Sequence, residues 1–218
     1  MIFGSAGGGW MDIYQAIDAR RTIRDFEDRA IDIDTLEKIL DAGLKAPTND
    51  HMRSWEFIVV SDKEVRAAII EKIPKSVSVR QIEGIFKSWG LDDKIQQSCY
   101  MDAIPKQYRM LYNAGALILP FFKQSSPLLK PKTLSDLNAI VSMWCCLENI
   151  LLAAASEGIM GVTRIPLGNE AEHIREVVHY PENYVLPCYL ALGYPLENAT
   201  RVKQYEFRSK DKIHMNTW

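Results

Sequence analysis

Three arginines and a threonine share one five-residue segment near the start of the chain, Arg20-Arg21-Thr22-Ile23-Arg24. Guanidinium groups at this density repel one another unless an anion lies between them. Each can donate two parallel hydrogen bonds to phosphate or carboxylate oxygens, and the threonine hydroxyl adds a further donor. The segment therefore predicts a phosphate-binding loop. The alternative is a helix end whose arginines suit the helix dipole and pair with Asp25, Glu27 or Asp28.

Three later segments also carry recognisable motifs. In chain order they are Ala46-Pro47-Thr48-Asn49 with the following Trp55-Glu56-Phe57-Ile58-Val59-Val60, then Ile165-Pro166-Leu167-Gly168, and finally Gly193-Tyr194-Pro195 with the following Arg201 and Lys203. Each segment alone is a weak signal, because proline and glycine form turns in most proteins. Four such segments in a fixed order are a specific signal.

The four segments together resemble the flavin-dependent nitroreductase family. Residues 20–26 resemble its opening R-R-[ST]-x-R-x-F signature, and residues 46–60 resemble its A-P-S…W-x-F-x-V-V segment. Residues 165–168 stand where the family places a loop across the redox edge of the flavin. Residues 193–203 resemble its G-Y-P segment with a basic pair behind it.

This resemblance covers residues 12–203 and implies an α+β fold. In that fold a mainly antiparallel central sheet is flanked by helices in a nitroreductase-like sandwich, and two chains form a domain-swapped homodimer. It also implies FMN bound at the dimer interface, in contact with both subunits. An apolar helix predicted over Leu134–Glu157 independently favours a dimer, because its length of about 36 Å exceeds what one small domain needs.

For the FMN phosphate, the resemblance implies a site built from two ends of the chain. Arg20, Arg21 and Thr22 supply donors from one end, and Arg201 and Lys203 supply them from the other. Charge-assisted hydrogen bonds of this kind contribute roughly 1.5–3 kcal/mol each. The alternative for the second pair is a solvated surface strand.

Arg24 is implied to lie near the pyrimidine edge of the flavin ring, where the reduced flavin carries negative charge. A fixed cation there stabilises the anionic reduced form and makes hydride acceptance easier. The alternative is a salt bridge with Asp25 or Glu27.

The resemblance also implies that Pro47, Thr48 and Asn49 approach the flavin from the partner subunit, with His51 beside them. His51 stands where Asn is common in the family, and Arg-Ser at 53–54 replaces the common Gln-Pro. These departures predict a subgroup with different contacts to flavin or substrate. The alternative for His51 is an ordinary surface or core histidine.

At Pro166-Leu167-Gly168 the useful groups are those of the backbone. The resemblance implies that a main-chain N–H in this loop hydrogen-bonds the N5 and O4 edge of the flavin. Such a contact needs a close approach of the main chain, which Gly168 permits. The alternative is a plain turn between a strand and a helix.

These residues predict an FMN-dependent NAD(P)H oxidoreductase that works by a ping-pong mechanism. NADH or NADPH delivers hydride to flavin N5, and a nitroaromatic, quinone or other electron-poor acceptor then takes the electrons. No protein side chain is predicted to act as a catalytic nucleophile, because the cofactor supplies the reactivity. Two alternatives stay open. One is a specialised relative that dehalogenates iodotyrosines or fragments flavin, with residues 74–110 as its lid, and the other is a non-catalytic dimer that binds flavin or another anion.

Composition limits the other function classes. The net charge of −2 in 218 residues predicts no binding to nucleic acid or to an anionic membrane. The four cysteines have no zinc-ligand spacing, which predicts reduced thiols in a cytoplasmic protein and no metal site. They are Cys99, Cys145, Cys146 and Cys188.

Hydrophobic periodicity predicts a single domain over residues 11–218, after a flexible extension or tag at residues 1–10. No stretch is expected to have the uninterrupted apolar length of a membrane span. The expected helices cover residues 12–20, 34–46, 61–73, 134–157 and 169–180, with caps at Asp34, Ser61 and Asn169. The expected strands cover residues 55–60, 116–122, 159–163 and 185–192.

Overall fold

A sheet of mainly antiparallel strands forms the centre of the computed structural model, which describes residues 11–124, 128–202 and 207–218. The strands are β1 (Trp55–Val60), β2 (Ala116–Lys123), β3 (Met160–Arg164), β4 (Tyr184–Val185) and β5 (Tyr189–Gly193). Their order is β1-β2-β5-β3, and β4 pairs with β2. All of these named pairs are antiparallel.

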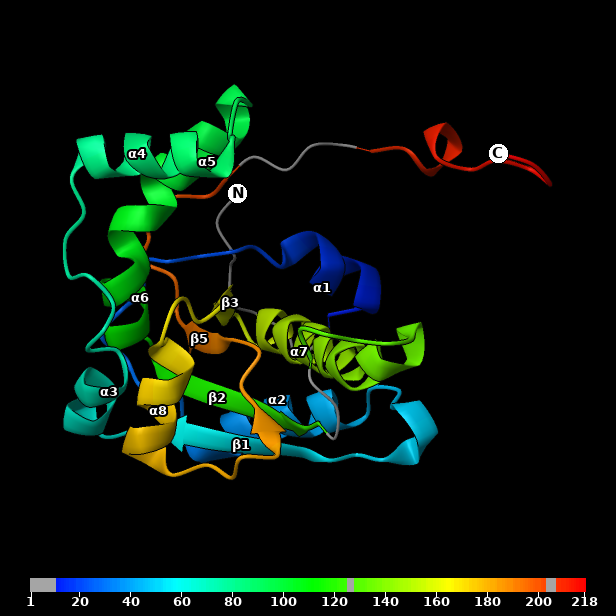
Figure 1. The fold of residues 1–218 in the computed structure, drawn as a ribbon, viewed down its shortest axis with the longest axis horizontal. Helices are drawn as coiled ribbons and strands as arrows, with labels where there is room; N and C mark the ends of the chain where they lie inside the picture. Colours follow the sequence, from blue (N-terminus) through cyan, green and yellow to red (C-terminus); the bar gives the residue numbers. More distant parts are fainter. Residues whose placement is uncertain (1–10, 125–127, 203–206) are drawn as a thin grey trace.

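Helices cover both faces of this sheet (Figure 1). On one face lie α2 (Ile33–Leu44) and α7 (Asn138–Ser156), and on the other lie α3 (Lys63–Ile69), α6 (Gln107–Tyr112) and α8 (Glu170–Val178). The apolar residues of β2 alternate between the two faces. Leu117 and Leu119 pack with α3 and α8, whereas Ile118 packs with α2 and α7. This alternation gives the fold two cores that share one sheet.

Helix α7 follows a short 3-10 helix, Leu134–Leu137, and stops before Gly158, whose φ of +74° suits glycine. Its inner face, which includes Met143 and Leu147, is fully buried. Its outer face carries Val141, which is 56% exposed. In a single chain this apolar helix is therefore buried on its inner face and exposed on its outer face.

Residues Leu134–Ser156 also form a helical stretch long and apolar enough to cross a membrane by length and composition. The expectation that no such stretch exists was wrong, because the few polar residues on this helix do not lower its mean hydropathy enough. The stretch packs against α2, β2 and β3 as a core helix does.

The structure corrects several predicted element boundaries. Asp32 caps α2 in place of Asp34, and Asp62 caps α3 in place of Ser61, because these carboxylates accept the free N–H groups of the first turn. Helix α3 ends at Ile69, before the predicted residue 73. The predicted strand over residues 185–192 is split into β4 and β5 around Pro187, which has no N–H to donate. The side chain of Asn169 makes no cap hydrogen bond.

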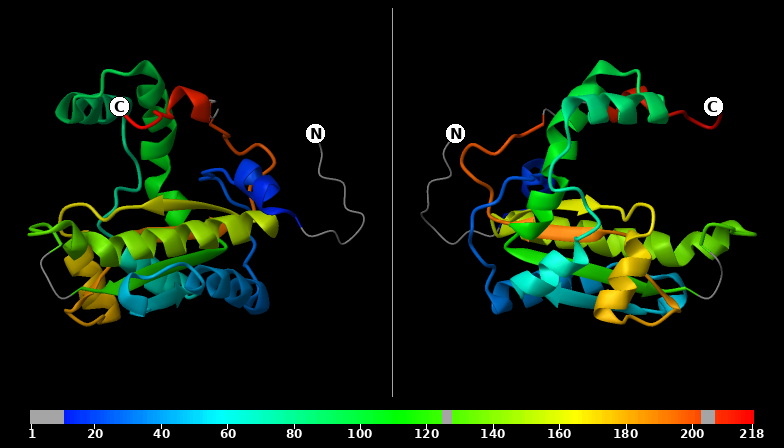
Figure 2. Two further views of the ribbon diagram at one scale, coloured as in Figure 1. Left: turned by 90° about the vertical axis from the view of Figure 1, so that its right-hand side faces the viewer. Right: turned by 60° about the vertical axis from the view of Figure 1, so that its left-hand side comes forward.

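Residues 74–110, which showed no clear pattern, fold into α4 (Val79–Trp89), α5 (Lys94–Ala103), a 3-10 helix Ile104–Lys106 and the start of α6. Figure 2 shows α4 and α5 standing away from the sheet on the far end of α6. Trp89 and Tyr100 pack edge to face across the two helices, with ring centroids 5.6 Å apart. These helices, α4 and α5, are called the lid helices below.

The two ends of the described chain behave differently. Helix α1 (Ile13–Ala19), predicted over residues 12–20, packs against α7 and is capped by Asp12. The last described segment, residues 207–218, extends away from the sheet and its flanking helices (Figures 1 and 2). All of its side chains are exposed, and it contains only a short 3-10 helix, Ser209–Asp211. The expected extension at residues 1–10 lies outside the described residues.

Candidate functional site

The arginine-rich segment leaves α1 and runs along the outer edge of β3. Thr22 forms a parallel bridge with Gly161, and the N–H of Ile23 donates to the Gly161 carbonyl at 3.3 Å. The Ile23 side chain is fully buried in the core, which fixes its neighbours. The side chains of Arg20, Arg21 and Thr22 all remain partly exposed beside this edge. The fold therefore presents the donors on a backbone that the core holds in place.

The contacts of Arg20 and Arg21 differ from those that the salt-bridge alternative predicts. Arg20 lies 3.7 Å from Glu148 of α7, in a pair that is open to solvent and therefore weak. The Arg21 guanidinium donates to the carbonyls of Asp18 and Arg20. Among the described residues, neither of these arginines pairs with the acidic residues that follow at 25–28.

The segment that follows the arginines pairs with the Gly-Tyr-Pro segment from the other end of the chain. Phe26 bridges Pro195, and the N–H of Glu27 donates to the Tyr194 carbonyl at 2.8 Å. Gly193 permits this approach, because a Cβ built on it would lie 2.8 Å from the Phe26 ring. The two ends of the chain are thus held side by side at this edge of the sheet.

Arg201 follows this paired segment directly, and its side chain is exposed. The residue before it, Thr200, accepts a hydrogen bond from Lys106 at 3.1 Å. Because Lys106 also pairs with Asp25, the backbone next to Arg201 lies close to the end of the arginine segment. Lys203, the second predicted basic residue, lies outside the described residues.

Arg24 is partly buried, and among the described residues nothing accepts a hydrogen bond from its guanidinium group. Burial lowers its pKa, and the negative charges of Asp102 and Asp25 oppose that effect. Arg24 also lines a cavity of about 410 Å³ together with Lys106, Arg109 and Asn113. A partly buried cation with unused donors, next to a cavity, suits an anionic ligand.

Asp25 does not pair with Arg24, contrary to the alternative drawn from the sequence. Its carboxylate lies 2.5 Å from the Lys106 ammonium and 2.7 Å from the Arg109 guanidinium. Burial alone would raise the pKa of Asp25, but the hydrogen bonds and charges of these two cations outweigh burial and lower its pKa. Sequence reasoning missed this network, since its members lie about eighty positions apart.

The Pro166-Leu167-Gly168 loop follows β3 and so reaches the same edge of the sheet. An ion pair between Arg164 and Glu170 holds its two ends, with both side chains at least nine-tenths buried. The Tyr189 hydroxyl donates to Glu170 at 3.1 Å, and Arg164 donates to Gln107 at 2.7 Å. Sequence reasoning missed this pair, although opposite charges on both sides of a short loop are a usable signal.

Within the loop, the apolar side chain of Leu167 is half exposed, and Gly168 has a φ of +57° with open space at its Cβ position. A left-handed residue with free space beside it allows a close approach of another molecule to the main chain.

The Pro47-Thr48-Asn49 segment lies elsewhere in a single chain. The N–H of Asn49 donates to the Ser142 hydroxyl at 3.1 Å, near the start of α7, whereas Arg20 meets the same helix at Glu148. Six helical residues separate these contact points by about 9 Å along the axis. The structure therefore does not bring this segment onto the arginine segment of its own chain.

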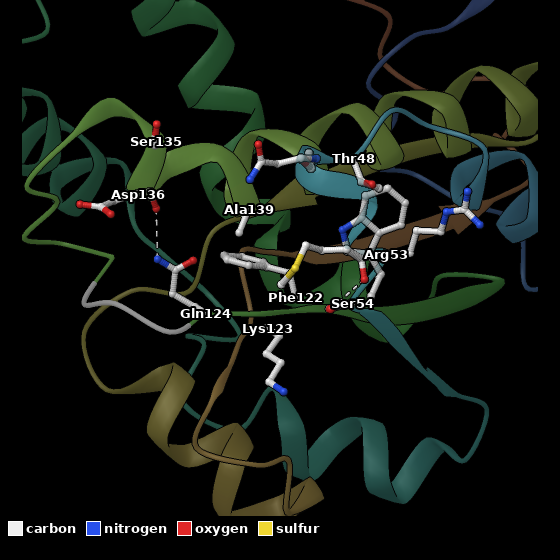
Figure 3. Close-up of a pocket in the computed structure, with 13 residues that line it drawn as sticks. Thr48, Arg53, Ser54, Phe122, Lys123, Gln124, Ser135, Asp136 and Ala139 are labelled. Carbon is white, nitrogen blue, oxygen red and sulfur yellow. Dashed lines mark hydrogen bonds between the residues drawn. The ribbon is translucent and has the colours of Figure 1, made fainter.

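A cavity of about 250 Å³ lies beside this segment (Figure 3). Thr48, Arg53 and Ser54 line one side, and residues of β2 and of the helix before α7 line the other. The backbone is strained here, because His51 and Arg53 have φ values of +54° and +41°.

The described residues contain no group of three or more histidine, cysteine or acidic side chains that could hold a metal ion. Burial raises the pKa of the Cys146 and Cys188 thiols to about 12, so these two are not thiolates at neutral pH.

Comparison with known proteins decides the family. The model of the Nitroreductase family matches residues 17–194. The chain belongs to the nitroreductase family. The match spans the arginine segment, the Pro166–Gly168 loop and most of the Gly-Tyr-Pro segment, so the resemblance read from the motifs is confirmed.

Two relatives of this chain illustrate the range of proteins to which it is similar. A protein from Methanothermobacter thermautotrophicus with the provisional name NADH dehydrogenase/NAD(P)H nitroreductase is 29% identical over 216 residues, covering 95% of this chain and 88% of the relative. Iodotyrosine deiodinase 1 of Rattus norvegicus is 30% identical over 206 residues, covering 93% of this chain and 68% of the relative.

Solved structures agree on the fold. Oxidized iodotyrosine deiodinase bound to FMN and 3-iodo-L-tyrosine has a TM-score of 0.72 at 20% identity, covering 95% of this chain and 100% of that one. Nitroreductase A from Vibrio parahaemolyticus has a TM-score of 0.66 at 22% identity, covering 94% and 75%. The expected α+β nitroreductase-like sandwich is confirmed.

Proposed function

We propose that this nitroreductase-family protein is an FMN-dependent NAD(P)H oxidoreductase that passes electrons to an electron-poor acceptor such as a nitroaromatic or a quinone. The observation that carries the proposal is the arrangement at the edge of β3. There the arginine segment lies beside the segment that leads to Arg201, and the loop after β3 leaves the same edge strand. This donor set fits FMN, since it offers cations for the phosphate and an unpartnered Arg24 for the ring.

The residues take the following roles in this proposal. Arg20, Arg21 and Thr22 hold the phosphate with help from Arg201 and Lys203, through charge-assisted hydrogen bonds. FMN, when bound, supplies the hydride-accepting chemistry.

The ring of the cofactor is held by other groups. Arg24 stabilises negative charge on the pyrimidine edge of the reduced ring. A main-chain N–H of Pro166–Gly168, in practice that of Leu167 or Gly168 because proline has none, donates to the redox edge. No protein side chain is assigned a proton-transfer step.

The second half of the site comes from another copy of the chain in this proposal. The contact of Asn49 with α7 lies about 9 Å along the helix from that of Arg20, which supports the assignment of Pro47, Thr48, Asn49 and His51 to the flavin of a partner. The outer face of α7 supports a homodimer, because Val141 and Trp144 expose apolar surface beside the exposed apolar residues of α1. The extended residues 207–218, with their exposed Phe207, suit an arm that reaches across to the partner.

Size-exclusion chromatography with light scattering tests the dimer. We expect a mass close to twice 24.9 kDa. A monomer that still binds FMN tightly would contradict the partner-side assignment of residues 47–51.

The visible absorption spectrum of the purified protein, before and after anaerobic addition of NADH and then NADPH, tests the function. We expect a yellow protein whose flavin bands bleach with at least one nicotinamide and return when a quinone is added. A colourless protein that does not take up added FMN would contradict the proposal. A flavin that neither nicotinamide reduces would favour the non-catalytic alternative.

A specialised dehalogenase is the second candidate. The deiodinase relatives favour it, and so does the ion pair that ties Asp102 of the lid helix α5 to Lys106, which lines the Arg24 cavity. Tight binding of 3-iodotyrosine to the oxidised protein, with poor turnover of quinones, would support this candidate over the first. The cytoplasmic location and the single domain over residues 11–218 stay predictions.

A further inference from the structure

Lys106 is a buried charged side chain near the candidate site that the proposed function does not use. It ends the 3-10 helix after α5, and its side chain is only 10% exposed. Its ammonium lies 2.5 Å from a carboxylate oxygen of Asp25, 2.5 Å from one of Asp102 and 3.1 Å from the Thr200 hydroxyl. The ammonium donates hydrogen bonds to Asp25 and Thr200, and it forms an ion pair with Asp102.

The three partners come from three different parts of the fold. Asp25 ends the arginine segment, Asp102 lies on the lid helix α5, and Thr200 directly precedes Arg201. Lys106 therefore ties a lid helix to both ends of the chain that form the candidate site.

Arg24 lines the same cavity as Lys106 and Asp25, and Asp102 lies 2.5 Å from the same Lys106 ammonium. Asp25 and Asp102 both act electrostatically on the Arg24 guanidinium, yet among the described residues neither forms an ion pair with it. In a partly buried setting the attraction between a free carboxylate and this guanidinium would be strong, because water screens it poorly. Another cation must therefore pair with these carboxylates and keep them from pairing with Arg24.

We propose that Lys106 is a positioning residue that holds Asp25 and Asp102 and thereby leaves the Arg24 guanidinium open to an anionic ligand. The proposal rests on the proposed function in taking the ring of FMN as that ligand.

The two carboxylates differ in the ion-pair partners that they keep if Lys106 is replaced. Asp25 keeps Arg109, which lies 2.7 Å away. Asp102 has no other ion-pair partner among the described residues. Replacing Lys106 therefore releases Asp102 in particular, and Arg24, which has no ion-pair partner among the described residues, is a partly buried cation that the charge of Asp102 already influences. The proposal predicts a new Arg24–Asp102 ion pair in that variant.

A crystal structure of the Lys106→Met protein tests this step without any flavin. We expect an Arg24 nitrogen within about 4 Å of an Asp102 oxygen. An Arg24 guanidinium that stays unpaired in this variant would overturn the proposal. Since this arm needs no cofactor, it gives an answer even if the protein binds no FMN and the proposed function fails.

The second arm measures binding of oxidised and reduced FMN to each variant, from which the preference for the reduced form follows. Lys106→Met should lower that preference roughly tenfold, because the pair with Asp102 withdraws a charge-assisted contact from the reduced ring. Adding Asp102→Asn to the same protein should restore the preference to within about twofold. The matched control is Lys87→Met, which removes an exposed lysine from the lid helix α4 and should change nothing.

A test in a protein that lacks Arg24 distinguishes the positioning role of Lys106 from a purely structural role. In an Arg24→Met background, the further change Lys106→Met should have no effect on the preference for reduced FMN. An equal effect in both backgrounds would mean that Lys106 acts by its own charge or by holding the lid, and would overturn the proposal.

If the Lys106→Met protein does not fold, the Asp102→Asn variant alone tests the proposal. Lys106 already holds Asp102 in the normal protein, so this variant should keep the preference for reduced FMN within about twofold. A larger rise that disappears in the Arg24→Met background would show Asp102 already engaging Arg24, and would overturn the proposal.

Discussion

The segments Arg20–Phe26 and Pro47–Arg53 are both predicted to contact the same cofactor, yet the chain holds them very differently. The first is bridged to β3 and to Pro195, buries Ile23 and Phe26, and ends in an ion-pair network. The second is exposed over most of its length, contacts the start of α7 through Asn49, and carries two residues with strained backbone.

This difference indicates that one chain builds only half of the site in final form. The arginine segment is preorganised by its own core, so a ligand need not order it. The proline segment stores strain that its own contacts do not balance, as is common where a further contact completes a site. Five predictions test this difference between the arginine segment and the proline segment.

The largest effect is expected from Arg20→Ala combined with Arg21→Ala. The protein should fold, because both side chains lie outside the core, but it should lose FMN. Two charge-assisted contacts contribute about 3–6 kcal/mol together, so the dissociation constant should rise roughly 10²–10⁴-fold. Fluorescence titration with FMN measures this, and full flavin occupancy in the purified variant would contradict the phosphate assignment.

Arg24→Ala should keep the flavin but make its reduction harder. Loss of about 1.5–3 kcal/mol of stabilisation of the reduced form corresponds to a potential lower by about 30–60 mV. Spectroelectrochemistry measures the potential. An unchanged value would leave Arg24 with no role at the ring.

Gly193→Ala should disturb the preorganised segment through the core. The new Cβ would lie 2.8 Å from the Phe26 ring and 3.1 Å from the Gly115 nitrogen, so the free energy of unfolding should fall by about 1–3 kcal/mol. Urea unfolding measures it. Gly84→Ala is the matched control, because its Cβ meets open space within a helix and should stabilise the protein slightly. Equal effects from both variants would contradict the close packing at Gly193.

Asp25→Asn should destabilise the protein in a pH-dependent way. The pKa of Asp25 lies below its ordinary value of 3.8 in the folded chain, so its contribution is complete above that pH and is lost as the pH falls through the folded pKa. The difference in unfolding free energy between variant and parent should therefore be large at neutral pH and shrink below about pH 4. Urea unfolding at both pH values measures this, with the exposed Asp92→Asn as control. A difference independent of pH would count against the Asp25 ion pairs.

The smallest effect is expected in the strained segment. His51→Gly should raise the free energy of unfolding by about 0.5–1 kcal/mol, because glycine adopts a φ of +54° without strain. Met52→Gly should lower it by a similar amount, since Met52 has an ordinary φ of −65°. A loss of stability in His51→Gly would show that the segment is not strained in solution.

Much of the fold could be predicted from local patterns. The strand over residues 55–60 follows from its β-branched and aromatic content, and its observed bounds match. Helix caps were less certain, because Asp32 and Asp34 are both good caps and only hydrogen bonding decides between them. The break at Pro187 depended on which residues of the strand pair with β2, which no local pattern specifies.

The candidate site could be predicted only as far as its motifs reach. The motif residues around Arg24 and Pro166 do arrive at one edge of the sheet. Lys106 and Glu170 were missed, because each acts through partners that only the folded chain brings near. The contribution of residues 47–51 depends on a second copy, so a single chain leaves it a prediction.

The buried ion pair between Arg164 and Glu170 has a consequence for how this protein can change. It closes the ends of the loop after β3 without using any residue inside the loop. The side chains at positions 165, 166, 167 and 169 can then be exchanged while the strand and the helix keep their places, whereas Gly168 must stay because its φ of +57° suits glycine. These four positions are therefore the natural target for directed evolution of this loop.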